Sequence, residues 1–168
     1  MEGRPLNPEP PAGPRGARDR PARIVPLQPA HEGQWRALWQ AYLDFYEAAL
    51  APEVTDGLWA ALVSGDAVRR GFGATIGDAL VGFALVVVHP ATWSLAPTAY
   101  LEDLFVRPDA RKQGVGRALI EAIVAEGRAQ GWTSLYWHTK AGNRAARALY
   151  DRFTSADDFV RYRLTLGG

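Results

Sequence analysis

A turn that carries two glycines has the composition of a phosphate-binding site. Gly114 and Gly116 come after an apolar segment and stand at the start of an amphipathic one. The start of a helix presents unpaired N–H groups and a partial positive charge, and glycine allows an anion to approach the backbone without meeting a Cβ. Lys112 and Arg117 oppose the helix dipole unless an anion is bound, so their presence favours an anion site. Such a turn can therefore hold a pyrophosphate.

Two better-known nucleotide-binding loops do not fit these residues. A P-loop needs Gly-Lys-Ser or Gly-Lys-Thr where the helix begins, whereas Gly116 is followed by Arg117 and Ala118. The dinucleotide fingerprint needs a third glycine three residues after the second, and Leu119 occupies that place. Both kinds of site are therefore excluded.

Two adjacent carboxylates lie in the apolar segment that precedes the turn. Neighbouring side chains on a strand point to opposite faces unless a bulge intervenes, so only one of Glu102 and Asp103 is expected to face a site. Glu102 shares its face with Tyr100 and Leu104, and a carboxylate among apolar residues is costly unless it has a partner or a task. We interpret Glu102 as a general base or an anchor for an amine. The alternative is a structural ion pair with a nearby arginine.

Three motifs, in the same order along the chain, resemble the GCN5-related N-acetyltransferase (GNAT) superfamily. The signature of that family is Arg or Gln, two residues, Gly, one residue and then Gly or Ala, and Arg111, Gly114 and Gly116 match it. Residues 100–106 (YLEDLFV) look like the strand that binds the cofactor in the family. Residues 143–150 (NRAARALY) look like its later Asn…Ala…Leu-Tyr helix.

The resemblance implies that the chain binds acetyl-CoA as a co-substrate and needs no metal. Backbone groups of Leu104, Phe105 and Val106 would pair with the pantetheine arm like an added strand. The amides from Lys112 to Ala118 would hold the pyrophosphate. The complete set of implied cofactor contacts is Leu104, Phe105, Val106, Arg111, Lys112, Gln113, Gly114, Val115, Gly116, Arg117, Ala118, Asn143 and Tyr150.

The resemblance also assigns the role of general acid to Tyr150, which would protonate the departing CoA thiolate. A phenol with a pKa of about 10 is protonated at neutral pH, so it can give up that proton without prior adjustment. Alternatively, Leu149 and Tyr150 are only core residues of an amphipathic helix. Asn143 has two compatible interpretations, a helix N-cap and a cofactor contact. One departure from the family is that no Gly-Phe pair follows Tyr150.

A narrower similarity concerns the acceptor. Residues 135–140 (LYWHTK) and the Leu-Glu-Asp run at 101–103 are similar to a subgroup that includes histone, polyamine and D-amino-acid acetyltransferases. We therefore expect a primary amine to attack the thioester directly, the acceptor being a small cationic amine, an amino acid or a lysine side chain. The rival hypothesis is a non-catalytic acyl-CoA-binding regulatory module that binds the cofactor without turnover.

Hydrophobic periodicity and turn residues predict the elements that position these groups. Strands are expected at residues 24–27, 71–76, 80–88, 98–106, 134–139 and 159–166, and helices at 31–50, 54–63, 114–130 and 143–153. Gly77 and Asp78 predict a hairpin, and the strand–helix–strand order around the glycine turn predicts a parallel pair. The expected fold is α/β, with a mixed, mostly antiparallel central sheet, a V-shaped split between strands 4 and 5, and helices on both faces.

Length and composition are typical of one globular domain that binds neither nucleic acid nor membranes. The chain has 168 residues, of which 48% are hydrophobic, and a net charge of +1, so it can bury one core but gathers neither phosphates nor anionic lipid. The absence of cysteine excludes disulfides, thiolate metal sites and a cysteine nucleophile, and it fits a cytoplasmic location. No pair of histidines has metal-ligand spacing. We expect a flexible tail over residues 1–21 and a single N-acetyltransferase domain over residues 22–168.

The end of the chain is expected to take part in assembly. Residues 159–166 alternate in polarity as a strand does. An edge strand with one apolar face invites pairing with a second copy, so we expect a homodimer.

Overall fold

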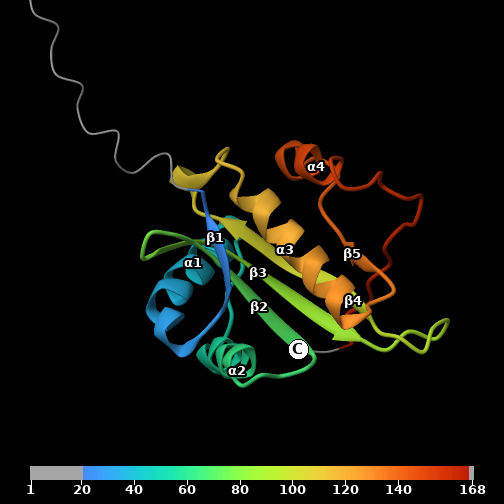
Figure 1. The fold of residues 1–168 in the computed structure, drawn as a ribbon, viewed down its shortest axis with the longest axis horizontal. Helices are drawn as coiled ribbons and strands as arrows, with labels where there is room; N and C mark the ends of the chain where they lie inside the picture. The colour runs from blue at the N-terminus through green and yellow to red at the C-terminus, as the bar shows by residue number, and fades with distance from the viewer. Residues whose placement is uncertain (1–20, 167–168) are drawn as a thin grey trace, which may run out of the picture.

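The computed structural model describes residues 21–166, whose arrangement is shown in Figure 1. The strands are β1 (Arg23–Pro26), β2 (Arg69–Ile76), β3 (Ala79–His89), β4 (Thr98–Val106) and β5 (Leu135–Trp137). The α-helices are α1 (Glu32–Phe45), α2 (Pro52–Val63), α3 (Val115–Gln130) and α4 (Arg144–Tyr150). Of the expected tail at residues 1–21, all but Pro21 lies outside the described residues.

The five strands form one sheet in the order β1-β2-β3-β4-β5. The first four run antiparallel to their neighbours, and β5 pairs with β4 in parallel. A parallel neighbour requires a crossover connection, which α3 provides between β4 and β5 (Figure 1). This topology confirms the expected mixed, mostly antiparallel α/β fold.

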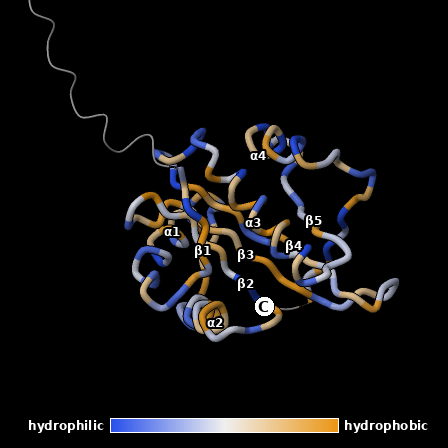
Figure 2. Tube along the Cα trace, in the orientation of Figure 1, coloured by the Kyte–Doolittle hydropathy of each residue, from blue (hydrophilic) through white to orange (hydrophobic). Residues whose placement is uncertain are grey.

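The helices cover the two faces of the sheet unequally. On one face, Trp35 of α1 and Trp59 of α2 lie 4.9 Å apart between ring centroids and share a buried cluster with Phe83 of β3. On the other face, Leu119 and Ile120 of α3 are completely buried in a second cluster. Figure 2 shows apolar residues along β3, between these two layers. Burial of both faces of the central strands stabilises the frame that carries the site.

The strands β4 and β5 separate after a short contact. They pair only at Ala99 with Leu135, at Tyr100 with Tyr136 and at Leu101 with Trp137. Beyond this contact, β4 runs on to Val106 with no further strand partner on that edge among the described residues. The split that the sequence predicts between strands 4 and 5 is therefore present, and it leaves backbone groups of β4 free on one side.

Several predicted boundaries are too long, and one predicted element is wrong. β5 has three residues, fewer than expected. α1 ends at Phe45, because the chain leaves the helical conformation at Tyr46. Residues 159–166 form no strand, and the side chains of Phe159 and Tyr162 are 87% and 90% exposed. Alternation alone does not make a strand, since the backbone groups also need a neighbouring strand to pair with.

No helix within residues 21–166 has both the length and the apolar character that crossing a membrane requires.

Candidate active site

The glycine turn connects β4 to α3, and two of its residues have a left-handed backbone conformation. Gly114 caps the helix with φ of +80° and offers no side-chain cap, and Lys112 has φ of +61°. A Cβ added to Gly114 would meet no atom within 4 Å, so the positive φ, rather than crowding, calls for glycine here. The first N–H groups of a helix have no partner within the helix. The open space beside Gly114 thus lies next to uncapped amides, the arrangement suited to an anion.

Gly116 has a different structural reason to be glycine. A Cβ at this position would lie 3.1 Å from Cδ2 of Leu149 in α4 and 3.8 Å from Cγ2 of Val106. The helix α3 therefore packs closely against α4 at this point. This packing is a structural reason for glycine here, and the expected contact of Gly116 with the pyrophosphate stays a prediction.

The polar side chains around the turn bond to nearby parts of the chain, and one of them reaches β4. Nε of Arg111 donates to the carbonyl of Val106 at 2.9 Å, and Nε2 of Gln113 donates to the carbonyl of Asp109 at 2.9 Å. Arg117 pairs with Glu121 at 2.8 Å on the helix surface. An exposed pair of this kind contributes little to stability, so a bound anion can compete for the guanidinium.

The edge of β4 beside the split carries the residues expected to contact the pantetheine arm. The side chains of Leu104 and Val106 pack with the α3 cluster, whereas Phe105 belongs to the cluster under α1. The strand is thus packed on both faces, and its backbone N–H and C=O groups on the side of the split remain accessible. The carbonyl of Val106 is already occupied by Arg111, so the neighbouring backbone groups are those free to pair.

Tyr150 is the last residue of α4 and is half-buried beside β5. Its ring lies 5.4 Å from that of Trp137 between centroids. Burial, with a smaller contribution from Tyr46, raises the pKa of Tyr150 to about 12. The phenol is therefore fully protonated at neutral pH and is able to act as a proton donor.

Asn143 begins α4 as a helix cap. Its Oδ1 accepts a hydrogen bond from the N–H of Ala146 at 3.2 Å. The cap fixes the start of a helix of only seven residues that carries Tyr150 at its other end. Of the two interpretations of Asn143, the structure confirms the N-cap.

A bulge in β4 changes the expected orientation of the two carboxylates. Leu101 lies opposite Val86 of β3 and Asp103 lies opposite Leu85, so Glu102 has no partner in the register. Leu101 and Leu104 both pack in the cluster on the α3 side. Alternation from Leu101 turns Glu102 to the α1 side, and alternation from Leu104 turns Asp103 to the same side. The bulge between Leu101 and Asp103 makes this possible. The bulge is the stated exception to strand alternation, so alternation no longer limits the site to one of the two carboxylates.

Asp103 is held by a tyrosine that the sequence analysis did not identify. The hydroxyl of Tyr42 in α1 donates to Oδ1 of Asp103 at 2.6 Å. Burial raises the pKa of Asp103 to about 6, an effect that the Tyr42 hydrogen bond partly offsets and the charge of Glu102 adds to. Burial, followed by the charge of Asp103, also raises the pKa of Tyr42. Tyr42 shares the helical spacing of the α1 tryptophans, so the sequence pattern alone indicates a core residue.

Tyr46, at the end of α1, links the carboxylate side to the phenol side. Its ring lies 5.0 Å from that of Tyr42, and its hydroxyl contributes to the raised pKa of both Tyr42 and Tyr150. Nζ of Lys140 lies 5.4 Å from the Tyr46 ring centroid. The end of α1 thus lies near both candidate proton-transfer groups, the Asp103 carboxylate held by Tyr42 and the Tyr150 phenol.

Aromatic rings continue the same face of the sheet beyond Glu102. Tyr100 of β4 and Tyr136 of β5 are stacked with centroids 5.1 Å apart, and His138 lies 5.4 Å from Tyr100. Nε2 of His89 lies 3.0 Å from the Tyr136 hydroxyl. This face offers π-systems to a bound cation next to two carboxylates.

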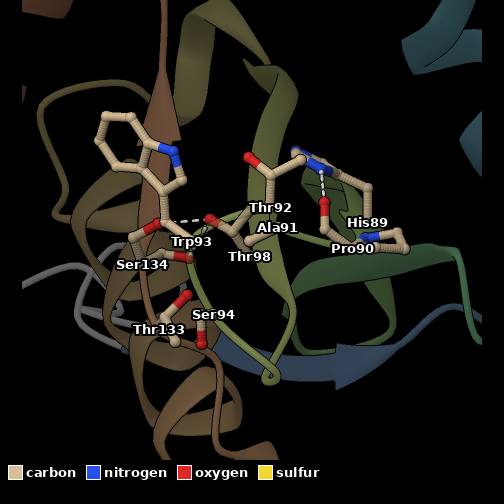
Figure 3. A pocket seen from close by; sticks show the side chains of 9 residues that line it. All are labelled: His89, Pro90, Ala91, Thr92, Trp93, Ser94, Thr98, Thr133 and Ser134. Atoms are coloured by element: carbon tan, nitrogen blue, oxygen red, sulfur yellow. Dashed lines mark hydrogen bonds between the residues drawn. The ribbon is translucent and has the colours of Figure 1, made fainter.

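The hollow drawn in Figure 3 lies beside the start of β4 and shares His89 with this aromatic face, but its chemistry differs. It has a volume of about 710 Å³ and is lined by His89, Pro90, Ala91, Thr92, Trp93, Ser94, Thr98, Thr133 and Ser134. Thr98 begins β4 and the glycine turn follows its end, so roughly 26 Å of strand separates the two places, at about 3.3 Å per residue. It contains hydroxyls, as in the Thr98–Ser134 hydrogen bond, but no carboxylate. It is not the candidate active site.

Residues 21–166 contain no cluster of three or more His, Asp or Glu side chains that could hold a metal ion.

Comparison with known proteins bears on the family and the fold. The sequence profile of the Acetyltransferase (GNAT) family matches residues 33–154. The D-amino-acid N-acetyltransferase of Saccharomyces cerevisiae is 32% identical over 143 residues, which cover 83% of this chain and 88% of that protein. The thialysine N-epsilon-acetyltransferase of Caenorhabditis elegans is 35% identical over 100 residues, which cover 56% of this chain and 62% of that protein.

A solved structure described as a probable acetyltransferase is similar with a TM-score of 0.77 at 23% identity, covering 87% of this chain and 99% of that one. Together, the matches confirm the resemblance carried by the three motifs and the fold class predicted from the sequence.

Proposed function

The chain belongs to the acetyltransferase (GNAT) family, and on that premise we propose that it transfers an acetyl group from acetyl-CoA to a primary amine of a small cationic amine or an amino acid. It is an N-acetyltransferase, and the acetyl donor in its family is acetyl-CoA. The observation that carries the proposed acceptor is the pair Glu102 and Asp103 on one face of β4, beside the aromatic side chains of Tyr100 and Tyr136. Carboxylates and π-faces together attract an ammonium group.

The proposed donor site consists of main-chain groups on both sides of the split. Free backbone groups of β4 near Leu104 and Phe105 would pair with the pantetheine arm. The uncapped amides after Gly114 would hold the pyrophosphate, and Lys112 and Arg117 would add positive charge there. In this proposal the thioester lies near the split, between the carboxylates of β4 and Tyr150.

The proposed reaction is direct attack of a neutral amine on the thioester carbon. Glu102 anchors the ammonium form of the acceptor before it loses a proton. Tyr150 protonates the CoA sulfur as the carbon–sulfur bond breaks, a role that its raised pKa of about 12 permits at neutral pH. No nucleophilic side chain is required in this scheme.

A release assay for free CoA tests the proposed function. The purified chain is mixed with acetyl-CoA and, in turn, polyamines, D- and L-amino acids and a lysine peptide. Thiol release that depends on a small amine or an amino acid is the expected result, in line with the substrates named for the yeast and nematode relatives. Release with the lysine peptide alone would contradict the small acceptor. Acetyl-CoA binding without release across the panel would favour the regulatory module.

We also propose a cytoplasmic homodimer, as the sequence suggests. Residues 159–166 keep large apolar side chains in solvent, including Val160, Leu164 and Leu166 at 73%, 82% and 91% exposure. β5 stands at the edge of the sheet and is short, so it is a candidate partner for such a segment in a second copy. Light scattering at high micromolar concentration should give the mass of a dimer, and a monomer mass would contradict this part. The cytoplasmic location rests on the lack of cysteine.

A further inference from the structure

We propose that Asp103, positioned by Tyr42, accepts the proton from the acceptor amine, and that Glu102 anchors the amine without taking that proton. This inference rests on the proposed acetyl transfer and assigns one step of it to a residue. The sequence favours Glu102 for the base, because it shares an apolar face with Tyr100 and Leu104. The bulge removes that reason, since it brings Asp103 to the same side of the sheet.

The two carboxylates differ in how firmly they are held. Asp103 is half-buried, and its Oδ1 receives the Tyr42 hydroxyl at 2.6 Å, a short hydrogen bond typical of a charged acceptor. Glu102 is exposed at the bulge. A proton acceptor must be held within hydrogen-bond reach of the nitrogen, whereas an anchor for an ammonium ion tolerates a mobile side chain. The fixed carboxylate is therefore the better base.

The charges near Asp103 also suit proton transfer near neutral pH. From α1, Tyr42 faces Asp103, and Tyr46 lies behind Tyr42. On β4, Glu102 and Tyr100 are its neighbours. The residue opposite on β3, Leu85, is apolar. Among the described residues, no lysine, arginine or histidine contributes to its pKa, which burial raises to about 6. Asp103 is thus ionised at pH 7, yet more basic than an exposed aspartate.

The proton balance of the reaction closes with these assignments. The ammonium gives one proton to Asp103, and the neutral nitrogen then forms a bond to the thioester carbon. As the carbon–sulfur bond breaks, sulfur takes the proton of Tyr150, and the second proton lost by nitrogen restores that phenol through solvent. Asp103 releases its proton to solvent, so the net reaction of an ammonium and acetyl-CoA yields an amide, free CoA and one proton.

The role of Tyr42 is that of a positioning residue, and it has a consequence for the pH dependence. Its hydroxyl stabilises the ionised form of Asp103 and so lowers that pKa, while the charge of Glu102 raises it. Loss of either group should therefore shift the acidic limb of the rate profile, in opposite directions. If Tyr42 and Glu102 had only a structural role, the acidic limb would stay in place in both variants.

The test is the pH profile of kcat/KM for the best amine, measured by CoA release from pH 5 to 9. Wild type should lose activity as the pH falls through about 6. Y42F should move this limb up by roughly half a pH unit or more and E102Q should move it down, since each change removes one influence on Asp103. D103N should lower kcat/KM by about 10²-fold. Y162F, at an exposed position, is the matched control and should keep the wild-type profile.

The outcomes separate this assignment from the proposed function. If the acidic limb of kcat/KM is lost in E102Q and unchanged in Y42F, the assignment of Asp103 is overturned and Glu102 is the base. Absence of CoA release from wild type with every amine would instead overturn the proposed function. Titration of the Asp103 carboxyl carbon by NMR gives a readout without turnover, and a pKa close to 4 in the wild type would also contradict the assignment.

Discussion

The turn at the start of α3 and the face of β4 below α1 differ in what they offer a ligand. The turn offers main-chain amides and the free edge of a strand, held by packing between α3, α4 and β4. The face of β4 offers side chains, namely Glu102, Asp103 and the tyrosines around them. A donor site made of backbone can hold the same cofactor while the side chains of an acceptor site change. Substitutions on the two sides should therefore affect donor and acceptor separately.

The largest effect is expected at Tyr150, which borders both regions. Y150F keeps the ring and its contact with Trp137, so folding and acetyl-CoA affinity should stay close to wild type. The turnover number should fall by about 10²-fold or more, because the hydroxyl is needed only when sulfur gains negative charge. Steady-state kinetics with calorimetry measures both quantities. A kcat within threefold of wild type would show that Tyr150 is not the acid, and equal losses of affinity and kcat would make it a cofactor contact.

A change at Gly114 should act on the donor side alone. G114V forces a β-branched residue to φ of +80° and places methyl groups in the open space beside the α3 amides. Acetyl-CoA affinity should fall by more than tenfold, with the pH limb of the acceptor side unchanged. Calorimetry on the folded variant measures this, and unchanged affinity would reject the turn as the pyrophosphate site.

A change at Gly116 should act mainly on stability. G116A places a Cβ 3.1 Å from Leu149 and so disturbs the packing of α4 on α3. We expect a loss of about 1–2 kcal/mol of unfolding free energy, the usual range for overpacking, with a smaller loss of affinity than at Gly114. Chemical denaturation measures the first and calorimetry the second. A variant as stable as wild type but unable to bind acetyl-CoA would show that Gly116 is needed for the cofactor rather than for packing.

The smallest effect is expected at Asn143. N143A removes the hydrogen bond to the Ala146 amide and should cost about 1 kcal/mol of local stability in α4. N143D can still accept this hydrogen bond and serves as the control. Hydrogen exchange of the α4 amides should rise in the alanine variant only. If both variants lose acetyl-CoA affinity and neither loses protection, Asn143 is a cofactor contact.

The same comparison explains how much the sequence could predict. The split sheet and the glycine turn were predictable, because left-handed turn residues and hydrophobic periodicity have local signatures. The bulge at Glu102 was not, since it depends on the register with β3. Tyr42 has the spacing of a core residue, and only the folded chain brings it to Asp103, 61 positions away.

Strand 159–166 was wrongly predicted for a related reason. The alternating pattern is local, whereas a strand depends on a partner elsewhere, and the described residues provide none for this segment. Sequence therefore predicted the backbone of the proposed donor side better than the geometry of the proposed acceptor side, which long-range contacts determine.

The most direct test of this division is the acetyl-CoA dissociation constant of the double variant E102Q/D103N, measured by calorimetry beside its rate of CoA release. We expect an affinity within about threefold of wild type and a kcat/KM for the amine lowered by about 10²-fold or more, because both substitutions lie on the proposed acceptor face. A folded double variant that releases CoA at the wild-type rate, or that loses acetyl-CoA binding together with activity, would contradict it.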